Sequence, residues 1–280
     1  MLLAKEEEHV GVKGYAPGQK TEHDLSWSGW TLANDISPDN KWLLFDEEGV
    51  IVAGTNYIVG IRTLEGSAPV RLAQGNSARF TRDGKWVNTM PVIGAPRAIL
   101  VPTGVGASKE IPVPLEKVSW ALTPPDDAHI MFGGAEHGHA FRCYIQEIGT
   151  GKIKAVSPEG TESCEPAPDG SSIAALSPEG KLTVYPLSDQ PPRVVPGDTA
   201  GLEPVRWSSE GLFVYRNALP ARIIRIDPVT GKQTVARELA PTDSAGLIGI
   251  SPVVLSPDAK AYAYSYRRTL SELYVVEGLK

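Results

Sequence analysis

One turn motif recurs through the whole sequence at nearly constant spacing. Each copy has an acidic residue that follows Pro, Arg or Ser and precedes Gly, Asn, Asp or Ala. The copies are Ser37-Pro38-Asp39-Asn40-Lys41, Thr81-Arg82-Asp83-Gly84-Lys85, Pro124-Pro125-Asp126-Asp127, Ala167-Pro168-Asp169-Gly170-Ser171, the degenerate Ser208-Ser209-Glu210-Gly211, and Ser256-Pro257-Asp258-Ala259-Lys260. The acidic residues are 44, 43, 43, 41 and 48 residues apart. A period in the forties with four short strands per unit is typical of a β-propeller.

The motif has the chemistry of a tight turn between two strands. Pro presets φ for the first central position of a type I turn, Asp bonds back to the backbone, and Gly or Asn accepts the left-handed conformation. Because the acidic residues occupy the same place in every repeat, we interpret them as turn formers and not as a ring of functional carboxylates. These predicted structural residues are Asp39, Asp83, Asp126, Asp169 and Asp258.

Runs on either side of the turns, such as 205–207 and 212–215, predict β-hairpins. A third apolar strand and a fourth, more polar strand follow in each unit, as at 222–226 and 234–236. The sequence therefore predicts an all-β propeller of four-stranded antiparallel blades, in a single domain over 1–280. Five full blades are expected within 31–245, with a partial blade at 246–280.

Two closures of the ring agree with the pattern at the chain ends. Residues 1–30 predict strands at 1–4, 9–15 and 22–27, and the last unit predicts strands at 252–255, 262–266 and 272–276. If each end forms its own three-stranded blade, the propeller has seven blades. If the strand at 22–27 completes the last blade, it has six. The strand-like character of residues 1–20 favours seven.

Composition excludes several classes of protein. With 28 Gly and 24 Pro among 280 residues, both types exceed their usual shares of about 7% and 5%, which indicates many turns and excludes a coiled coil or helical bundle. A net charge of −6 argues against a nucleic-acid partner, which would require a basic face.

No stretch has the length of a membrane span or the pattern of a signal peptide. We therefore expect a chain that is cytoplasmic as it stands, or extracytoplasmic as part of a longer membrane-anchored protein. Cys143 and Cys164 lie 21 residues apart without a CxxC partner. This spacing permits a disulfide, but the pattern favours two buried thiols.

Candidate ligand residues are few. Glu136, His137 and His139 form one tight cluster, and alternate residues of an extended segment point to the same face. Two histidines are too few for a zinc site, so we interpret the cluster as ordinary loop residues and expect no cofactor.

Arg79 and Arg206 lie in predicted inner strands, where their side chains can reach the channel. They are the candidate contacts for an anionic ligand at the channel mouth.

The Pro-Asp-Gly-type turns resemble those of TolB-type propellers, a WD-repeat-like class common in bacteria. The resemblance extends over nearly the whole chain to the C-terminal propeller of bacterial, eukaryotic-like serine/threonine kinases. The segments that carry it are His23-Asp24-Leu25-Ser26-Trp27, Val101-Pro102-Thr103-Gly104, Val156-Ser157-Pro158-Glu159-Gly160, Leu219-Pro220-Ala221-Arg222, Glu238-Leu239-Ala240-Pro241, Ala263-Tyr264-Ser265-Tyr266-Arg267-Arg268 and residues 272–280. The resemblance implies a sensing or docking appendage for signalling.

The catalytic motifs of the associated enzymes are absent from this sequence. It has no Gly-rich loop with a strand lysine, no His-Arg-Asp, no Asp-Phe-Gly and no Gly-x-Ser-x-Gly. We therefore expect a non-enzymatic module that binds a protein or peptide partner. The alternatives are a lactonase- or hydrolase-like propeller enzyme with a site at the channel mouth, and a gene fragment without an independent role.

Overall fold

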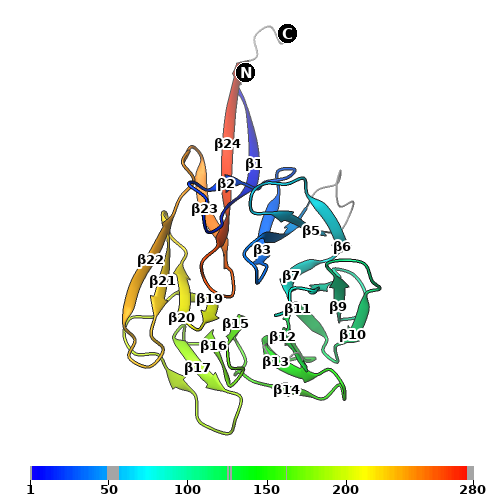
Figure 1. Cartoon of the computed structure of the whole chain (residues 1–280). Coiled ribbons are helices and arrows are strands. Elements are labelled where there is room, and N and C mark those ends of the chain that lie inside the picture. The colour runs from blue at the N-terminus through cyan, green and yellow to red at the C-terminus, as the bar shows by residue number, and fades with distance from the viewer. Residues whose placement is uncertain (1, 49–56, 125, 127, 162, 276–280) are drawn as a thin grey trace.

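The computed structural model describes residues 2–48, 57–124, 126, 128–161 and 163–275. Its strands form six four-stranded antiparallel sheets around a central axis, and the fold is a six-bladed β-propeller (Figure 1). Within these residues there is no helix long and apolar enough to cross a membrane.

Five blades are each built from four consecutive strands, with the first strand innermost. Blade 1 comprises β3 (Thr31–Ile36), β4 (Trp42–Glu47), β5 (Ile58–Thr63) and β6 (Val70–Gln74). Blade 2 comprises β7 (Asn76–Phe80), β8 (Trp86–Met90), β9 (Arg97–Pro102) and β10 (Lys109–Pro112). Blade 3 comprises β11 (Lys117–Leu122), β12 (His129–Ala135), β13 (Arg142–Glu147) and β14 (Ile153–Ala155). Blade 4 comprises β15 (Cys164–Pro166), β16 (Ser172–Leu176), β17 (Leu182–Pro186) and β18 (Arg193–Val194). Blade 5 comprises β19 (Leu202–Ser208), β20 (Gly211–Arg216), β21 (Ala221–Ile226) and β22 (Gln233–Leu239).

Blade 6 combines the two ends of the chain. From the axis outward its strands are β23 (Leu247–Leu255), β24 (Tyr262–Val275), β1 (Leu2–Tyr15) and β2 (His23–Asp24). The preference for seven blades was therefore wrong. The alternative of six blades is confirmed, with the strand near 22–27 (β2) completing the last blade, but β1 joins that blade as well, so each end of the chain contributes two strands. The two predicted strands at 1–4 and 9–15 are one strand, as are those at 262–266 and 272–276. Residues 276–280 lie outside the described part of the chain.

A cluster of aromatic and charged side chains holds the two ends together. Tyr15 of β1 stacks on Tyr262 of β24 with their ring centroids 5.4 Å apart. Glu22, in the loop that follows β1, accepts hydrogen bonds from the hydroxyls of Tyr262 at 2.8 Å and Tyr264 at 2.9 Å. Burial, followed by the charge of Glu22, raises the pKa of both hydroxyls, which keeps them protonated as donors.

Apolar packing is concentrated between the blades. Six clusters of buried side chains each span one pair of neighbouring blades, so every interface of the ring has its own core. Between blades 2 and 3, for example, Ala98 and Ile111 pack with Phe132 and Tyr144, and all four are at most 7% exposed. Each blade is thus stabilised on both faces by its neighbours, as expected for a closed ring of twisted sheets.

The repeated turns have the geometry of side-chain-stabilised tight turns. The Asp83 carboxylate accepts the backbone N–H of Lys85 at 3.0 Å, and Asp169 accepts that of Ser171 at 3.0 Å. These backbone donors hold the pKa of both carboxyls below the ordinary value. The residue after Asp is left-handed in four copies, with φ of 61° at Asn40, 69° at Gly84, 70° at Gly170 and 57° at Ala259. Pro125 and Asp127 of the third copy lie outside the described residues.

Replacing Ala259 with Gly should stabilise the propeller, because Ala259 is the one apolar L-residue among these four left-handed positions. We expect Ala259→Gly to raise the free energy of unfolding by about 0.5 kcal/mol. The matched change Gly170→Ala should lower it by about 1 kcal/mol, since nothing lies within 4 Å of the added Cβ and only the backbone conformation is penalised. Urea denaturation measures both, and changes of the same sign would contradict this account of the turn.

Candidate functional site

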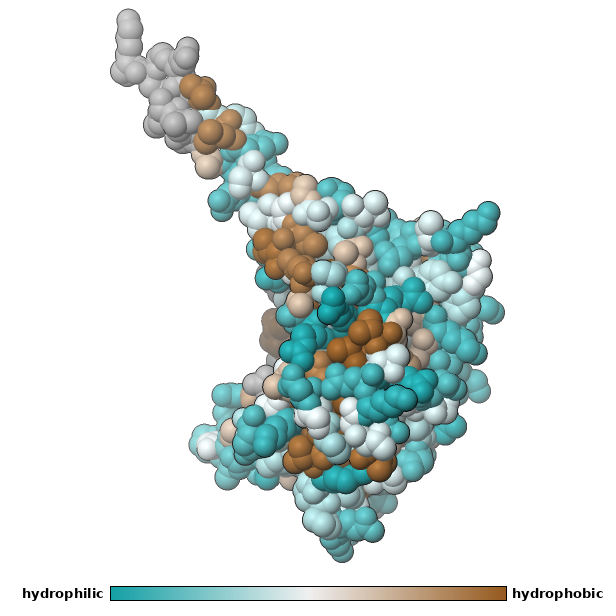
Figure 2. All heavy atoms as spheres, turned by 90° about the vertical axis from the view of Figure 1, so that its left-hand side faces the viewer, coloured by the Kyte–Doolittle hydropathy of each residue, from teal (hydrophilic) through white to brown (hydrophobic). Residues whose placement is uncertain are grey.

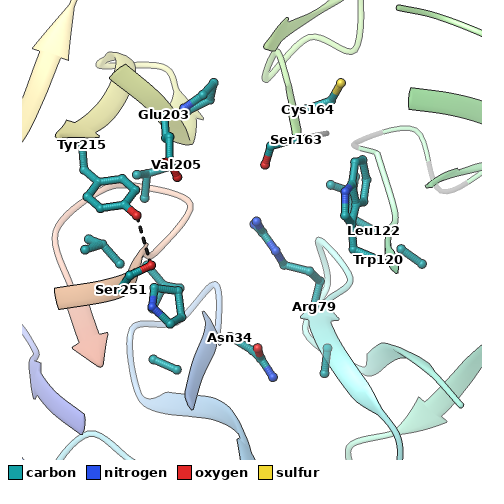
Figure 3. Close-up of a pocket in the computed structure, with 17 residues that line it drawn as sticks. Asn34, Arg79, Trp120, Leu122, Ser163, Cys164, Glu203, Val205, Tyr215 and Ser251 are labelled. Atoms are coloured by element: carbon teal, nitrogen blue, oxygen red, sulfur yellow. Dashed lines mark hydrogen bonds between the residues drawn. The ribbon is translucent and has the colours of Figure 1, made fainter. Parts of the chain in front are cut away.

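The inner strands enclose a hollow at one end of the propeller axis. It has a volume of about 240 Å³ and is lined by residues from the inner strands of all six blades (Figure 3). Asn34, Ala78, Trp120, Ser163, Val205 and Val253 each represent one blade in this lining. We call this cavity the axial hollow.

Charged and polar groups project into the axial hollow from different blades. The Arg79 side chain extends toward its centre from β7, while Glu203 lies on another wall, at β19 (Figure 3). Tyr215 of β20 and Ser251 of β23 join their hydroxyls at 3.1 Å. Burial raises the pKa of Tyr215 to about 12, so its hydroxyl stays neutral at physiological pH. The hollow therefore offers one cation, one carboxylate and neutral hydroxyls.

The floor below the hollow is an ion cluster centred on Arg206 of β19. Its guanidinium pairs with Asp35 of β3 and, at 3.3 Å, with Glu165 of β15. It also donates to the backbone carbonyl of Leu255 in β23, at 3.1 Å from Nε and 2.9 Å from Nη2. Asp35 in turn accepts the backbone N–H of Phe80 in β7 at 2.9 Å. We call this group the axial ion cluster, and it joins blades 1, 2, 4, 5 and 6.

The axial ion cluster is nearly removed from solvent. Side-chain exposure is 14% for Arg206 and 4% for each of its two carboxylate partners. Burial opposes the charge of the guanidinium, but the fields of Asp35 and Glu165 outweigh it and raise the pKa of Arg206 above its ordinary value. Arg206 is therefore a permanent cation whose charge is already compensated.

Arg79 has a different environment from Arg206. Its guanidinium lies 3.5 Å from the Glu165 carboxylate, and its side chain is 28% exposed. Among the described residues no other group pairs with it, so within that part of the chain most of its N–H donors have no partner. Sequence reasoning treated Arg79 and Arg206 as equivalent candidates. The structure brings them to the same carboxylate but leaves only Arg79 open to a ligand.

A second hollow lies beyond the axial ion cluster, on the side of the Pro-Asp turns. It has a volume of about 300 Å³ and is bordered by Asp35, Glu165 and Arg206 together with Pro38, Pro168 and Pro257. It is formed by residues that come later in each inner strand than those of the axial hollow. The ion cluster thus divides the channel into two separate hollows.

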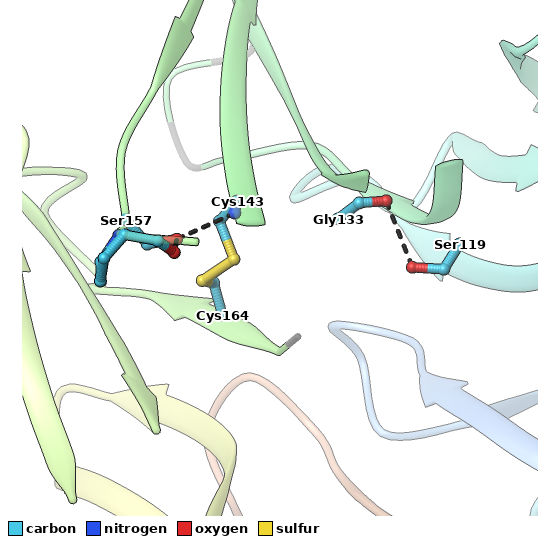
Figure 4. The surroundings of a disulfide bond; sticks show 6 residues. Ser119, Gly133, Cys143, Ser157 and Cys164 are labelled. Atoms are coloured by element: carbon cyan, nitrogen blue, oxygen red, sulfur yellow. Dashed lines mark hydrogen bonds between the residues drawn. A yellow bond between two sulfur atoms is a disulfide. The ribbon is translucent and has the colours of Figure 1, made fainter. Parts of the chain in front are cut away.

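Blade 3 is joined to blade 4 by a disulfide between Cys143 of β13 and Cys164 of β15 (Figure 4). The expectation of two buried thiols was wrong. The reason is spatial: the third strand of one blade lies against the innermost strand of the next, which brings residues 21 positions apart into contact. Cys164 lines the axial hollow and directly precedes Glu165 of the ion cluster.

The residues Glu136, His137 and His139, which cluster in the sequence, do not form a common site in the structure. His137 pairs with Glu116 at 2.8 Å, His139 pairs with Glu159 at 2.7 Å, and Glu136 pairs with Arg142 at 2.9 Å. The described residues contain no group of three or more His, Cys, Asp or Glu side chains that could hold a metal ion. These three side chains lie on blade 3 and take no part in the axial hollow.

Sequence reasoning missed several residues of the axial hollow. Glu203, Tyr215 and Ser251 were not singled out, although Glu203 lies in the same inner strand as Arg206. Strict alternation from Arg206 would place Glu203, three residues earlier, on the opposite face of β19, but a bulge between Pro204 and Arg206 shifts the register there. Tyr215 lies in β20, the second strand of blade 5, so a search limited to the innermost strands does not include it.

Comparison with known proteins supports the fold. No family model matches the chain, and no curated protein matches it in sequence. Among solved structures, putative TolB from Agrobacterium tumefaciens superposes with a TM-score of 0.69 at 16% identity, covering 94% of this chain and 99% of that one. TolB from Acinetobacter baumannii gives 0.59 at 13% identity, covering 92% and 63%. An oligogalacturonate lyase in complex with manganese also gives 0.59 at 13% identity, covering 92% and 78%. The chain thus has a TolB-like β-propeller fold.

Removing the disulfide should destabilise the propeller. The bridge closes a loop of about twenty residues, for which chain entropy gives about 3 kcal/mol of stabilisation. We expect the double variant Cys143→Ala/Cys164→Ala to unfold at clearly lower urea concentration than the parent protein. Its free energy of unfolding should be lower by about 3 kcal/mol. The parent protein in reductant should approach the variant, and reductant should leave the variant unchanged. Equal midpoints for the variant and the oxidised parent would show that the bridge does not stabilise the ring.

Proposed function

We propose that this protein is a non-catalytic binding module whose axial hollow receives an extended segment of a partner protein, with Arg79 contacting a carboxylate of that segment. The observation that carries the proposal is the contrast between the two channel arginines. Arg206 is saturated by Asp35, Glu165 and Leu255, whereas Arg79 faces the hollow with N–H donors for which Glu165 is the one partner among the described residues. A guanidinium with unused donors in a recess suits a carboxylate or phosphate oxygen.

The shape of the recess favours an extended chain over a compact small molecule. A groove of about 650 Å³ adjoins the axial hollow and shares Ser163, Glu203 and Pro204 with it. From there it runs outward over blade 4, along Leu176 and Pro178. A peptide could place one side chain in the hollow and lie along the groove, on a frame whose inner strands are fixed by the ion cluster.

Polar groups around the hollow define the rest of the segment. Glu203 has no cationic partner among the described residues, so it offers an acceptor to an N–H group or a basic side chain of the ligand. Trp120 and Leu122 provide apolar area on another wall. The preferred segment therefore carries a carboxylate near an apolar residue, with a donor group farther along the chain.

The alternative of a propeller enzyme receives less support from the composition of the axial cavities. Neither hollow is lined by a described histidine, and the carboxylates Asp35 and Glu165 are occupied by arginines. The similarity to the lyase concerns the fold, and the metal named with that protein has no group of candidate ligands among the described residues here.

A more specific form of the proposal is a sensor for a serine/threonine kinase, with the partner segment as its signal. It rests on the sequence resemblance of the propeller motifs. This form requires a kinase catalytic domain encoded upstream in the same reading frame or in an adjacent gene. Its absence from both places would remove the kinase association and leave the binding module.

Selection from a random peptide library displayed on phage tests the binding proposal. Peptides enriched on the parent protein should be rich in Asp or Glu and should bind Arg79→Met at least tenfold more weakly, as expected for loss of a charge-assisted hydrogen bond of about 1.5–3 kcal/mol. Arg222→Met is the matched control, because Arg222 lies on the outside of blade 5 and pairs with Glu238. Lack of enrichment, or equal binding to Arg79→Met, would contradict the proposal.

A further inference from the structure

The two terminal strands continue beyond the body of the propeller as a two-stranded ribbon. β1 and β24 stay in one unbroken register from Tyr15 opposite Tyr262 to Leu2 opposite Val275. The inner neighbour β23 leaves β24 at Arg268, and β2 pairs with β1 only at Lys13 and Gly14. The backbone N–H of Thr269 still donates to the Gly246 carbonyl at 2.9 Å. Residues 2–8 and 270–275 have no third strand among the described elements, and they project from the ring in Figures 1 and 2.

The β24 side of this ribbon is apolar and exposed. Exposure is 48% for Leu270, 69% for Leu273, 47% for Tyr274 and 68% for Val275. Between Thr269 and Val275 the strand has one charged residue, Glu272, whose carboxylate accepts the Tyr274 hydroxyl. Such an edge has unpaired backbone groups and strand-forming side chains, which make it a template for another strand.

The β1 side of the ribbon has the opposite chemistry. Lys5 is followed by Glu6, Glu7 and Glu8, and all four are exposed. Lys5 pairs with Glu7, and Arg267 pairs with Glu8 at 3.0 Å, which leaves a mainly negative edge. Charges on an edge strand oppose pairing with another chain, so the β1 edge is protected and the β24 edge is not.

We propose that the free edge of β24 pairs antiparallel with the same edge of a second copy of this chain, forming a continuous sheet β1-β24-β24-β1 across a two-fold axis. The charge distribution selects this occupant. Pairing of two β1 edges would set two glutamate runs against each other. Pairing of a β24 edge with a β1 edge would be head-to-tail and would not close. Only the β24–β24 arrangement buries the apolar edges of both copies. It leaves the acidic β1 strands at the two outer edges of the shared sheet, where they oppose the addition of further chains.

The two-fold axis also limits the register. Opposite residues in a sheet share a face, so in a symmetric antiparallel pair one residue must lie opposite its own copy. An axis at Glu272 would oppose two carboxylates. An axis at Leu273 instead sets Leu273 against Leu273 of the second copy, Glu272 against its Tyr274, and Ser271 against its Val275. The second register joins apolar side chains and gives Glu272 a hydroxyl partner.

An interface of about five residue pairs is smaller than the usual stable interface of roughly 1,200–2,000 Å². The dimer should therefore depend on concentration, with dissociation in the micromolar range or weaker. Higher salt should strengthen it, because it screens the residual repulsion between two ribbons that each carry net negative charge.

Sedimentation velocity on the full chain between about 1 and 300 μM tests the pairing. The parent protein should shift from monomer to dimer across this range. Leu273→Lys should raise the dissociation constant at least tenfold, because it sets two cations directly opposite each other. The matched control Val235→Lys, at a position 54% exposed on the outer strand β22, should dimerise like the parent protein. A parent protein that stays monomeric, or a dimer unaffected by Leu273→Lys, would overturn the proposal.

Single-cysteine variants test the register independently. Both native cysteines are in the disulfide, so an added cysteine is the sole free thiol. Under mild oxidation Leu273→Cys should form a covalent dimer rapidly, since the two Cα atoms would lie at disulfide distance. Leu270→Cys, three residues from the axis, should react at least tenfold more slowly. Equal or faster crosslinking through position 270 would overturn the register.

Discussion

The salt-bridged guanidinium of Arg206 is the contact on which the arrangement of the axis depends. It binds carboxylates from blades 1 and 4 and a carbonyl from blade 6, while Asp35 also fixes the backbone of blade 2 at Phe80. Burial of charge is costly, and the cluster is tolerable because each buried group has charge-assisted partners. The cluster also determines which channel arginine remains open, since Glu165 gives its shorter contact to Arg206 and its longer one to Arg79.

A disulfide joins blade 3 to the inner strand of blade 4, next to the axial ion cluster. The bridge from Cys143 ends at Cys164, the residue before Glu165. The shortest inner strand, β15, is therefore held at Cys164 by the disulfide and at Glu165 by two arginines. Disulfides persist chiefly in oxidising compartments. The covalent link beneath the axial hollow therefore depends on oxidising surroundings.

Much of the fold could be predicted from local chemistry. The turn motif determines hairpins through interactions within five residues, as at Asp83 and Asp169, so its period revealed the blades directly. The number of blades depended on pairing between the ends of the chain, which local patterns do not encode. One signal was available: residues 262–275 contain no Gly or Pro, which agrees with the single long strand β24 and not with a hairpin.

The site was less predictable for a similar reason. Arg79, Glu165 and Arg206 could be placed near the axis from their strands, but their pairing depends on how blades 2, 4 and 5 face one another around the axis. Tyr215 and Ser251 meet across 36 residues, and Glu203 reaches the same hollow only because a bulge before Arg206 shifts the alternation of β19. The disulfide is another long-range contact, visible only once neighbouring blades are packed.

The unfolding free energies of Arg206→Met and Arg79→Met test the central claim most directly. Both changes remove one guanidinium and keep an apolar side chain of similar length. We predict that Arg206→Met loses about 3–5 kcal/mol in urea denaturation, because Asp35 and Glu165 are left buried without their main cation. Arg79→Met should lose less than about 1 kcal/mol, as for a partly exposed pair at long distance. Equal losses, or a larger loss for Arg79→Met, would contradict the assignment of Arg206 to the frame and Arg79 to the ligand.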